Sequence, residues 1–480
     1  MPDRVTRRQF VKGLAVTTSA TLLAACKPQI VKETVVVEKP VDKVVKETVV
    51  VTEEKVVEKV VTATPAPVQK AELVFMYHTG GSGEGMEAYW EEECLPRFKA
   101  ENPHIDVSYT PTGLPEKLIA AFVAGNAPDV LADSSEHLPN YAELGQLLDL
   151  QPYLDRDLTE DDYSDWHGPQ LNFWKRTESP VGQFALPATC QTLAVLYNKD
   201  MFDEAAVEYP PRRWGSAWDH DEYAEAMGKL VKKDAEGNVD HWGSQVEQWP
   251  QRIQIHVNAF GGHFVDPEDN TRCALGDPEA QEALWWLYDR TWKDGAYVPL
   301  GNLGDIGQWQ TFEIGKTAMN EQGPWQIGYT AEAAEFNWNV APFPAGPAGL
   351  VTAGGSDGFG IWSGTKSPDA SWELLKFVTS RYFGKVLAEV YSWQPARKSV
   401  QMEWYSIFRS KFPALAEVDL EVFGEALAQE IAVPQELFKK ASASTELYYP
   451  AIEAVLVTGK ETPDLFKEVA EEITKVNRES

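Results

Sequence analysis

Cysteine is scarce in this chain of 480 residues, which contains only Cys26, Cys94, Cys190 and Cys273. No two of them are spaced as C-x-x-C, and an odd number follows Cys26. This pattern argues against the dense disulfide framework that holds many small secreted proteins together. We therefore expect the last three cysteines to be buried or inert thiols.

Basic residues are also few, which limits the classes of partner that the chain can bind. There are 43 Lys and Arg against 73 Asp and Glu, a formal net charge of -30. Nucleic-acid recognition depends on clustered Lys and Arg, so we expect no nucleic-acid partner. The sequence has no Walker A motif, no HExxH motif and no dense set of His and Cys. We therefore expect neither a cofactor nor a metal.

No histidine follows His263, and this removes one enzymatic interpretation. Residues 354–358, Gly-Gly-Ser-Asp-Gly, match the GxSxG pattern of a hydrolase nucleophile, which needs a later histidine. All eight histidines lie between His78 and His263, so we interpret this segment as a Gly-rich turn. Glycoside hydrolysis needs only two carboxylates, and the sequence leaves that chemistry open.

The N-terminus carries the features of an export signal. Arg7 and Arg8, with Phe10 two residues later, resemble a twin-arginine signal, and the Leu-Ala-Ala-Cys at 23–26 resembles a lipoprotein cleavage site. Cleavage before Cys26 would leave a lipidated cysteine that anchors the protein to the outer face of the cell membrane. An uncleaved N-terminal anchor is the alternative. No later segment approaches the length of apolar sequence that spans a bilayer, so we expect the body not to cross it.

Residues 27–70 are predicted to be a low-complexity tether. The heptapeptide Val-Lys-Glu-Thr-Val-Val-Val occurs at 31–37 and again at 45–51. Pro40 and the β-branched valine runs argue against one stable helix, although a coiled-coil stalk remains an alternative. A flexible tether would hold the body away from the membrane and leave it free to rotate.

From residue 71 the chain alternates predicted strands and helices. Buried strands are expected at 73–77, 105–109 and 129–132, and apolar residues at helical spacing lie between them, over 86–99 and 118–123. This alternation predicts an α/β architecture with a largely parallel sheet. The body is too long for one ordinary core, so we expect two domains.

Several short segments, spread in order over roughly 75–475, carry a family resemblance. They are Phe98-x-x-x-Asn102-Pro103-x-Ile105-x-Val107, Gly125-Asn126-Ala127-Pro128-Asp129-Val130, Leu196-Tyr197-Asn198-Lys199-Asp200, Gly315-Lys316-Thr317-Ala318-Met319, Gly323-Pro324-Trp325, Pro342-Phe343-Pro344 and Gly354-Gly355. Together they resemble the extracellular solute-binding protein family 1, which comprises carbohydrate-binding subunits of bacterial ABC importers similar to the maltose- and glycerol-phosphate-binding proteins.

The resemblance implies a fold of the two-lobe periplasmic-binding-protein type (type II) with hinge crossovers. By analogy, lobe one would hold 71–190 and 340–393, and lobe two 191–339 and 394–480. Segments near Ala188–Gln191, Asn339–Pro342 and Trp393–Pro395 would cross between the lobes. A ligand that touches both lobes adds contacts only in the closed state, and so shifts the equilibrium towards closure.

The resemblance also implies the function of a substrate-binding lipoprotein rather than an enzyme. Such a protein would capture a sugar or oligosaccharide and deliver it to the permease subunits of an ABC importer. We expect a monomeric body that works in the periplasm or outside the cell. Two alternatives stay open: a secreted, lipid-anchored glycoside hydrolase, and a binding protein for a polyamine or other small solute.

A sugar presents apolar C–H faces and a rim of hydroxyls, so a site for it combines aromatic rings with carboxylates and amides. Trp325 falls where the family places a stacking aromatic. Asp133 follows the third predicted strand, where it could contact a ligand or cap a helix. Gln191 matches a hinge position that is acidic in the maltose-binding relative, so the same sugar is not implied. The other candidate contacts are His78, Glu84, Trp249, Glu321, Gly355, Asp357, Trp393 and Tyr448.

Overall fold

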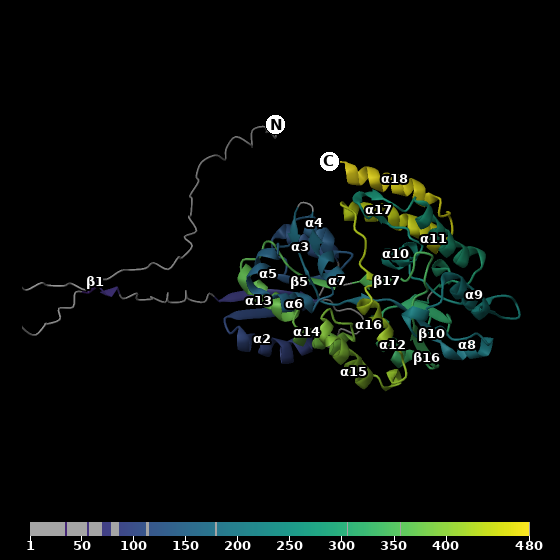
Figure 1. Ribbon diagram of the computed structural model, residues 1–480, viewed down its shortest axis with the longest axis horizontal. Coiled ribbons are helices and arrows are strands. Elements are labelled where there is room, and N and C mark those ends of the chain that lie inside the picture. Colours follow the sequence, from purple (N-terminus) through teal and green to yellow (C-terminus); the bar gives the residue numbers. More distant parts are fainter. Residues whose placement is uncertain are drawn as a thin grey trace, which may run out of the picture. The chain divides into compact units, whose positions relative to one another are not determined.

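The computed structural model describes residues 70–77, 86–111, 115–177, 180–304, 306–355 and 357–479, and two short strands ahead of them. These two strands, β1 (Thr34–Val35) and β2 (Lys55–Val56), pair antiparallel within a unit that ends at Gln69. Residues 70–480, here called the body, form the second compact unit (Figure 1). The predicted export signal with Cys26, and the candidates His78 and Glu84, lie outside the described residues.

The first lobe is built on a five-stranded sheet in the order β4-β3-β5-β18-β8. The strand β3 runs parallel to both β4 and β5, whereas β18 runs antiparallel to β5 and β8. The strands are β3 (Ala71–Tyr77), β4 (Ile105–Pro111), β5 (Val130–Ser134), β8 (Leu186–Pro187) and β18 (Asp357–Ile361). The alternation of strands and helices that the sequence predicts is present, and the α/β fold class is confirmed. The prediction of a largely parallel sheet is wrong, because β18 enters this sheet antiparallel to both of its neighbours.

Helices cover both faces of this sheet because its strands are apolar on both sides. Phe75 and Trp90 meet with their ring centroids 4.8 Å apart on one face, while Leu131 and Tyr141 pack on the other. The helices and lesser strands of this lobe are α1 (Met86–Tyr89), η3 (Trp90–Cys94), α2 (Leu95–Glu101), α3 (Pro115–Ala124), α4 (Leu138–Glu143), α5 (Gln151–Asp157), α6 (Glu160–Ser164), α7 (Gly168–Phe173), β6 (Lys175–Arg176), β7 (Gly182–Gln183), α13 (Pro368–Val378) and α14 (Arg381–Tyr391).

The second lobe contains a three-stranded antiparallel sheet in the order β15-β10-β16. Every residue of the central strand is buried, since helices enclose both faces. Its strands are β10 (Ala194–Asn198), β11 (Lys232–Lys233), β12 (Val239–His241), β13 (Val265–Asp266), β14 (Asp269–Cys273), β15 (Met319–Gln322) and β16 (Trp338–Ala341). Its helices between β9 and β17 are α8 (Lys199–Ala205), η4 (Trp214–Ser216), α9 (His220–Leu230), α10 (Pro250–Ala259), α11 (Pro278–Tyr288), η5 (Asp289–Lys293), η6 (Leu300–Asn302) and α12 (Pro324–Ala333).

The C-terminal part of the body is helical. Its α17 and α18 pack on one another and on the second lobe, and α18 buries Phe466, Val469 and Ile473 on one face. The elements are η7 (Lys398–Val400), α15 (Gln401–Lys411), η8 (Pro413–Leu415), α16 (Glu421–Ala428), β19 (Ala432–Val433), α17 (Ala441–Ile452), η9 (Glu453–Val457) and α18 (Leu465–Arg478).

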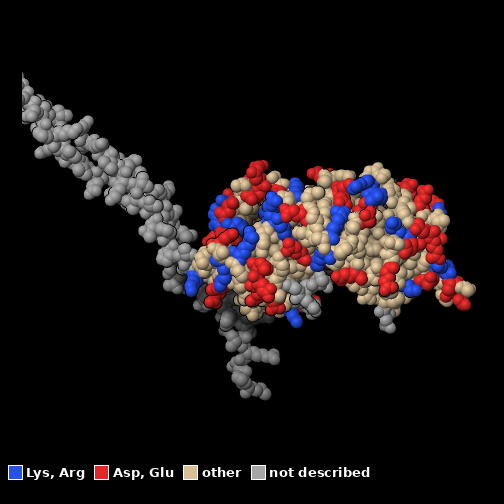
Figure 2. All heavy atoms as spheres, turned by 90° about the horizontal axis from the view of Figure 1, so that it is seen from below, with Lys and Arg blue, Asp and Glu red and all other residues tan. Residues whose placement is uncertain are grey.

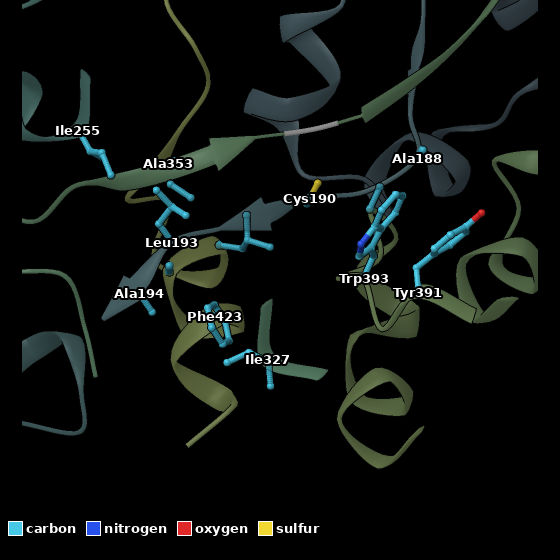
Figure 3. Close-up of a cluster of buried hydrophobic side chains, with 14 of the residues drawn as sticks. Ala188, Cys190, Leu193, Ala194, Ile255, Ile327, Ala353, Tyr391, Trp393 and Phe423 are labelled. Carbon is cyan, nitrogen blue, oxygen red and sulfur yellow. The ribbon is translucent and has the colours of Figure 1, made fainter. Parts of the chain in front are cut away.

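A third, small sheet connects the two lobes in the order β19-β17-β9. The strand β17 (Thr352–Gly355) lies between β9 (Gln191–Thr192), which is antiparallel to it, and the parallel β19. In Figure 1, β17 lies between the elements of the first lobe and those of the second. Figure 3 shows the apolar packing of this region, with Ala188, Cys190 and Leu193 on the segment that leads from the first lobe to the second. Trp393 lies on the segment that follows α14, and its ring stacks on Tyr391 with the ring centroids 4.5 Å apart.

The passages between the sheets can be compared with the predicted crossovers. The first leads from β8 through β9 to β10 and includes residues 188–191. The boundary predicted near 340 falls inside β16, which pairs with β10 in the second sheet, and the chain passes to the first sheet only at 352–357. The backbone N–H of Cys190 donates to Gln394 O at 3.1 Å, so the first and last passages lie side by side.

The cysteines and surface charges follow the composition. Cys94, Cys190 and Cys273 are buried and form no disulfide, as predicted. Burial raises the pKa of the Cys94 and Cys273 thiols to about 12. On the face of the body drawn in Figure 2, Lys and Arg are scattered among Asp and Glu rather than gathered into one broad basic surface. No helix in the described part of the chain is both long and apolar enough to cross a membrane.

Candidate functional site

Two helices of the second lobe begin at the boundary with the first lobe, and both begin with proline. Trp249 precedes Pro250 at the start of α10, and Gly323 precedes Pro324 at the start of α12. Proline fits the first helical position because it has no N–H to leave unpaired there. These starts place Trp249 and Trp325 at the N-terminal ends of the two helices.

Trp325 is held in place from several sides. Its Nε1 donates to Gln322 Oε1 at 3.1 Å, and the guanidinium of Arg252 lies 4.9 Å from its ring centroid, a cation–π contact. The ring folds back over Gly323, where an added Cβ would lie 2.0 Å from it. The indole is only partly buried, so part of it remains accessible. Glycine at 323 is thus what allows this position of the ring.

Arg252 pairs with a carboxylate that is completely buried. Glu247 Oε2 lies 3.4 Å from Arg252 Nε, and Glu247 Oε1 accepts a hydrogen bond from Gln322 Nε2 at 2.7 Å. Burial raises the pKa of Glu247, and the positive charge of Arg252 opposes that shift. A network of Trp325, Gln322, Glu247 and Arg252 therefore links the starts of α10 and α12.

Four buried polar atoms in or beside this network make no hydrogen bond with a described residue. They are Gln191 Oε1, Gln251 Nε2, and the ion-paired Glu247 Oε2 and Arg252 Nε. Gln191 pairs with Gly355 between β9 and β17, and a Cβ on Gly355 would lie 3.1 Å from the amide of Gln251. Buried polar groups in proteins nearly always make hydrogen bonds, so a local set of atoms that make none points to a place where a polar ligand binds.

Carboxylates gather on the first-lobe side, at the ends of β5 and β18. Asp133 is buried and accepts hydrogen bonds from Tyr141 OH at 2.9 Å and from the backbone N–H of Ser134 at 2.8 Å. Burial, followed by the negative charges of Asp133 and Glu136, raises the pKa of Asp357 to about 7. Both carboxylate oxygens of Asp133 therefore have partners within the protein, so Asp133 also stabilises the end of β5.

A cavity of about 300 Å³ lies between the lobes, and we call it the first cavity. The rings of Tyr448 and Tyr449 stack in its wall at 5.3 Å, and Trp249 meets Tyr449 edge-on at 6.4 Å. The backbone N–H of Ala441 donates to Glu143 Oε2 at 3.3 Å, which joins α17 to α4 of the first lobe. The cavity is lined by Glu136, His137, Asn140, Trp249, Gln435, Glu436, Leu437, Phe438, Ala441, Thr445, Tyr448 and Tyr449.

Electrostatic coupling connects the first cavity with the Trp325 network. Glu136 lines the cavity, and burial raises its pKa, while the charge of Arg252 acts in the opposite direction. The same carboxylate contributes to the raised pKa values of Asp357 and Tyr449, for which burial is the largest cause. We define the candidate site as the first cavity together with the Trp325 network and Asp357.

The structure brings seven of the predicted site residues to this region and places two others elsewhere. In or beside the candidate site lie Asp133, Gln191, Trp249, Trp325, Gly355, Asp357 and Tyr448. Glu321 is completely buried inside the second lobe, and Trp393 packs on Tyr391 and Tyr77 beside the last passage. The site that we propose below includes neither. His78 and Glu84 remain predictions because they lie outside the described residues.

Sequence reasoning missed four polar residues of the site. Glu247, Gln251 and Arg252 flank Trp249 and Pro250, and a helix start at Pro250 was the available signal for them. Glu136 follows Asp133 by three residues, and the same strand end pointed to it. Among the described residues, no three or more His, Cys, Asp or Glu are placed so that they could hold a metal ion.

Comparison with known proteins gives a family match. The family model described as bacterial extracellular solute-binding protein matches residues 80–381. The maltotriose-binding protein of Pyrococcus abyssi is 24% identical over 306 residues, which are 60% of this chain and 59% of that protein. An uncharacterized lipoprotein in the oleD 5′ region of Streptomyces antibioticus is 24% identical over 276 residues, 54% of this chain and 56% of that protein. The match thus spans less than two thirds of either relative.

Solved structures share the fold of the body. The ABC substrate-binding protein Lmo0181 of Listeria monocytogenes, solved in complex with cycloalternan, superposes with a TM-score of 0.71 at 23% sequence identity. The superposition covers 85% of this chain and 99% of that one. This likeness confirms the predicted two-lobe α/β fold.

Proposed function

This chain belongs to the bacterial extracellular solute-binding protein family, and from that membership we propose that it is the substrate-binding subunit of an ABC importer. It captures a sugar or oligosaccharide between its lobes and delivers it to the permease subunits in the membrane. The family resemblance that the sequence predicts is confirmed by the family match.

One observation carries the choice of a carbohydrate. The partly exposed ring of Trp325 lies beside buried polar atoms of Gln191 and Gln251 that make no hydrogen bond with a described residue, and beside the guanidinium of Arg252. A sugar fits this combination because its C–H face packs on the indole while its hydroxyls both donate and accept hydrogen bonds. The similarity to a maltotriose-binding protein and to a substrate-binding protein solved with cycloalternan supports the same class of ligand.

The placement of the site between two lobes supports capture by closure. The first cavity takes its lining from α4 of the first lobe, and from α17 and Trp249, just before α10, in the second. A ligand there contacts both lobes at once, so it stabilises the closed arrangement by its differential affinity. We propose that the permease recognises this closed form.

Export and anchoring complete the proposal. Twin-arginine export and lipidation at Cys26 would anchor the protein at the outer face of the membrane. The tether would keep the body, which we propose to be monomeric, close to that membrane. The similarity to an uncharacterized lipoprotein supports the anchor. In this role the sugar leaves chemically unchanged, so the protein is not an enzyme.

The test is incubation of the full-length chain with a library of neutral oligosaccharides, followed by thermal unfolding and chromatography of the sugars. We expect at least one sugar to raise the melting temperature, since a ligand stabilises the folded state that binds it. We also expect every sugar to be recovered intact. Repeated cleavage of a sugar would favour the glycoside hydrolase instead, and a library without any stabilising member would contradict the proposal.

The carboxylates of the first-lobe side favour one further candidate, a polyamine. Burial, and after it the negative charges of Asp133 and Glu136, raises the pKa of Asp357, and a bound cation would oppose the effect of those charges. Titration with spermidine at low and high salt tests this candidate. Tight, salt-sensitive binding of spermidine together with no response to sugars would favour it.

A further inference from the structure

A second cavity, of about 230 Å³, lies on the other side of α4 from the first. The two cavities share Gln435, Leu437 and Phe438, a segment that separates β19 from α17. Leu138, Pro139 and Ala142 of α4 line the second cavity, as do Asn270 and Lys439 of the second lobe. It therefore lies between the lobes as well and continues the first cavity past the 435–438 segment.

The walls of the second cavity include a fixed aromatic surface. Phe173, Trp174, Phe184 and Phe438 line it. Trp174 is buried against β18, since a Cβ added to Gly358 would lie 2.9 Å from its ring. Its Nε1 has no hydrogen-bond partner in the described part of the chain, and neither has Gln435 Oε1, which lines both cavities. Rings beside unpaired polar atoms repeat the combination found around Trp325.

The two cavities differ in charge. Lys175, Arg176 and Lys439 line the second cavity, and none of its described lining residues is acidic. The first cavity has the carboxylates Glu136 and Glu436 in its lining, and no Lys or Arg among the described residues there. Three cationic side chains in one cavity are notable in a chain whose formal net charge is -30.

The backbone holds these cations at the cavity. Lys175 and Arg176 form β6, which pairs with β7, and the N–H of Lys439 donates to Asn270 O at 3.0 Å. Arg176 also acts on the carboxylate of Glu143 on α4. Lys175 and Lys439 are exposed, and no ion pair with a carboxylate joins either of them in the described structure. Two positive charges thus remain available to a ligand in the cavity.

The sizes of the cavities suit a ligand of several sugar residues. Small-molecule pockets commonly have volumes of about 300–1,000 Å³, and each cavity alone is at or below the lower end of that range. The pair together falls within it. A ligand that fills both must pass the 435–438 segment, as a linear chain of sugars can.

We propose that the second cavity binds an anionic sugar residue, a uronic acid in particular, of an oligosaccharide whose neutral residues occupy the first cavity and the Trp325 network. The carboxylate lies between Lys175 and Lys439, and the sugar ring packs on Trp174. This inference rests on the proposed function and narrows its ligand to acidic oligosaccharides.

The test compares matched pairs of tetrasaccharides of glucose, mannose and galactose by titration calorimetry of the full-length chain at low salt. In each pair one member is neutral and the other has its terminal residue oxidised to the C6 carboxylate; a third arm carries a 6-phosphate. We expect an anionic member to bind about tenfold or more tightly than its neutral partner, as charge-assisted hydrogen bonds imply. The tighter of the two anionic arms identifies the group.

Variants assign the effect to the second cavity. The double variant Lys175→Gln/Lys439→Gln should lose the gain for the acidic sugar and keep the affinity for the neutral one. The matched control Lys233→Gln/Lys460→Gln removes the same charge from exposed lysines outside the lining and should keep the gain. Equal affinities for neutral and acidic sugars in the parent protein, or the same loss in both double variants, would overturn the inference alone. Failure of every sugar to bind would overturn the proposed function with it.

Discussion

Two glutamates of the second lobe, Glu247 and Glu321, are both completely buried and differ in how their carboxylates are paired. Glu321 accepts hydrogen bonds from Tyr297 OH at 2.6 Å and Tyr223 OH at 3.1 Å, and His256 Nε2 lies 3.0 Å from its other oxygen. Both of its oxygens therefore have partners within the lobe. A buried carboxylate that is fully paired in this way contributes to the fold and offers little to a ligand.

The carboxylate of Glu247 is, by contrast, incompletely paired. Its Oε1 accepts from Gln322 Nε2, but its Oε2 lies 3.4 Å from Arg252 Nε and makes no hydrogen bond with any described residue. The incomplete pairing is found next to the accessible ring of Trp325. The comparison teaches that burial alone does not separate a structural carboxylate from one prepared for ligand, whereas the pairing of each oxygen does.

The largest expected effect comes from Glu321. The variant Glu321→Ala leaves Tyr223, Tyr297 and His256 without their acceptor in a solvent-free interior. We expect the free energy of unfolding to fall by about 3–5 kcal/mol, as measured when one partner of a buried pair is removed. Urea denaturation measures it, with the exposed Glu282→Ala of α11 as the control, expected within about 0.5 kcal/mol of the parent. A loss below about 1 kcal/mol in Glu321→Ala would show that its three contacts matter little.

Trp325→Ala should act on binding and not on the fold. For a sugar that raises the melting temperature of the parent, we expect a loss of roughly 2–4 kcal/mol in binding free energy, the range seen for aromatic hot spots. Calorimetry measures the affinity, and Trp309→Ala, a partly exposed tryptophan outside the site, is the control. If Trp325→Ala binds the sugar as tightly as the parent does, Trp325 is not the stacking ring. If it keeps a salt-sensitive affinity for spermidine, the polyamine candidate gains support.

Replacing both members of the Glu247–Arg252 pair tests the contrast with Glu321 further. The double variant Glu247→Leu/Arg252→Met removes both charges, and such replacement of a buried pair is often neutral or stabilising. We expect the unfolding free energy to stay within about 1 kcal/mol of the parent or to rise, while sugar affinity falls about tenfold or more. A destabilisation as large as that of Glu321→Ala would mean that the Glu247–Arg252 pair is structural, which would remove the contrast between the two glutamates.

Much of the fold can be predicted from the sequence because its signals are local. The apolar residues at 73–77 and the helical spacing of Trp90 and Phe98 determine a strand and a helix from neighbouring residues alone. The boundary near 340 is harder, because β16 is a short apolar strand that suits either sheet. Only its pairing with β10 assigns it to the second lobe, and that contact is made between residues far apart in the chain.

The position of Glu321 outside the proposed site also has a simple cause. Glu321 and Gln322 are neighbours near Trp325 in sequence, and both looked suited to a ligand site. Successive side chains of a strand point to opposite faces, so on β15 Gln322 faces Trp325 and Glu247, whereas Glu321 faces Tyr297. The sequence pattern around 321 is polar on both sides, so it does not show which face is directed to the site.

Asp357 provides the smallest expected effect, one that depends on pH. Its pKa is raised to about 7 by burial and by the negative charges of Asp133 and Glu136, with the positive charge of His137 opposing them. In the unfolded chain the pKa of an aspartate is about 3.9, so between about pH 4 and pH 7 the folded state binds more protons than the unfolded state. Stability therefore falls as pH rises through this window, in contrast to the usual salt-bridged aspartate.

The variant Asp357→Asn cannot ionise, so it lacks this loss of stability. We expect the difference in unfolding free energy, variant minus parent, to increase from pH 4.5 to pH 7. Urea denaturation at both values measures the difference, and a gap between variant and parent that stays constant with pH would show that the carboxyl at 357 titrates normally and that the first-lobe side of the site is less crowded with negative charge than we infer.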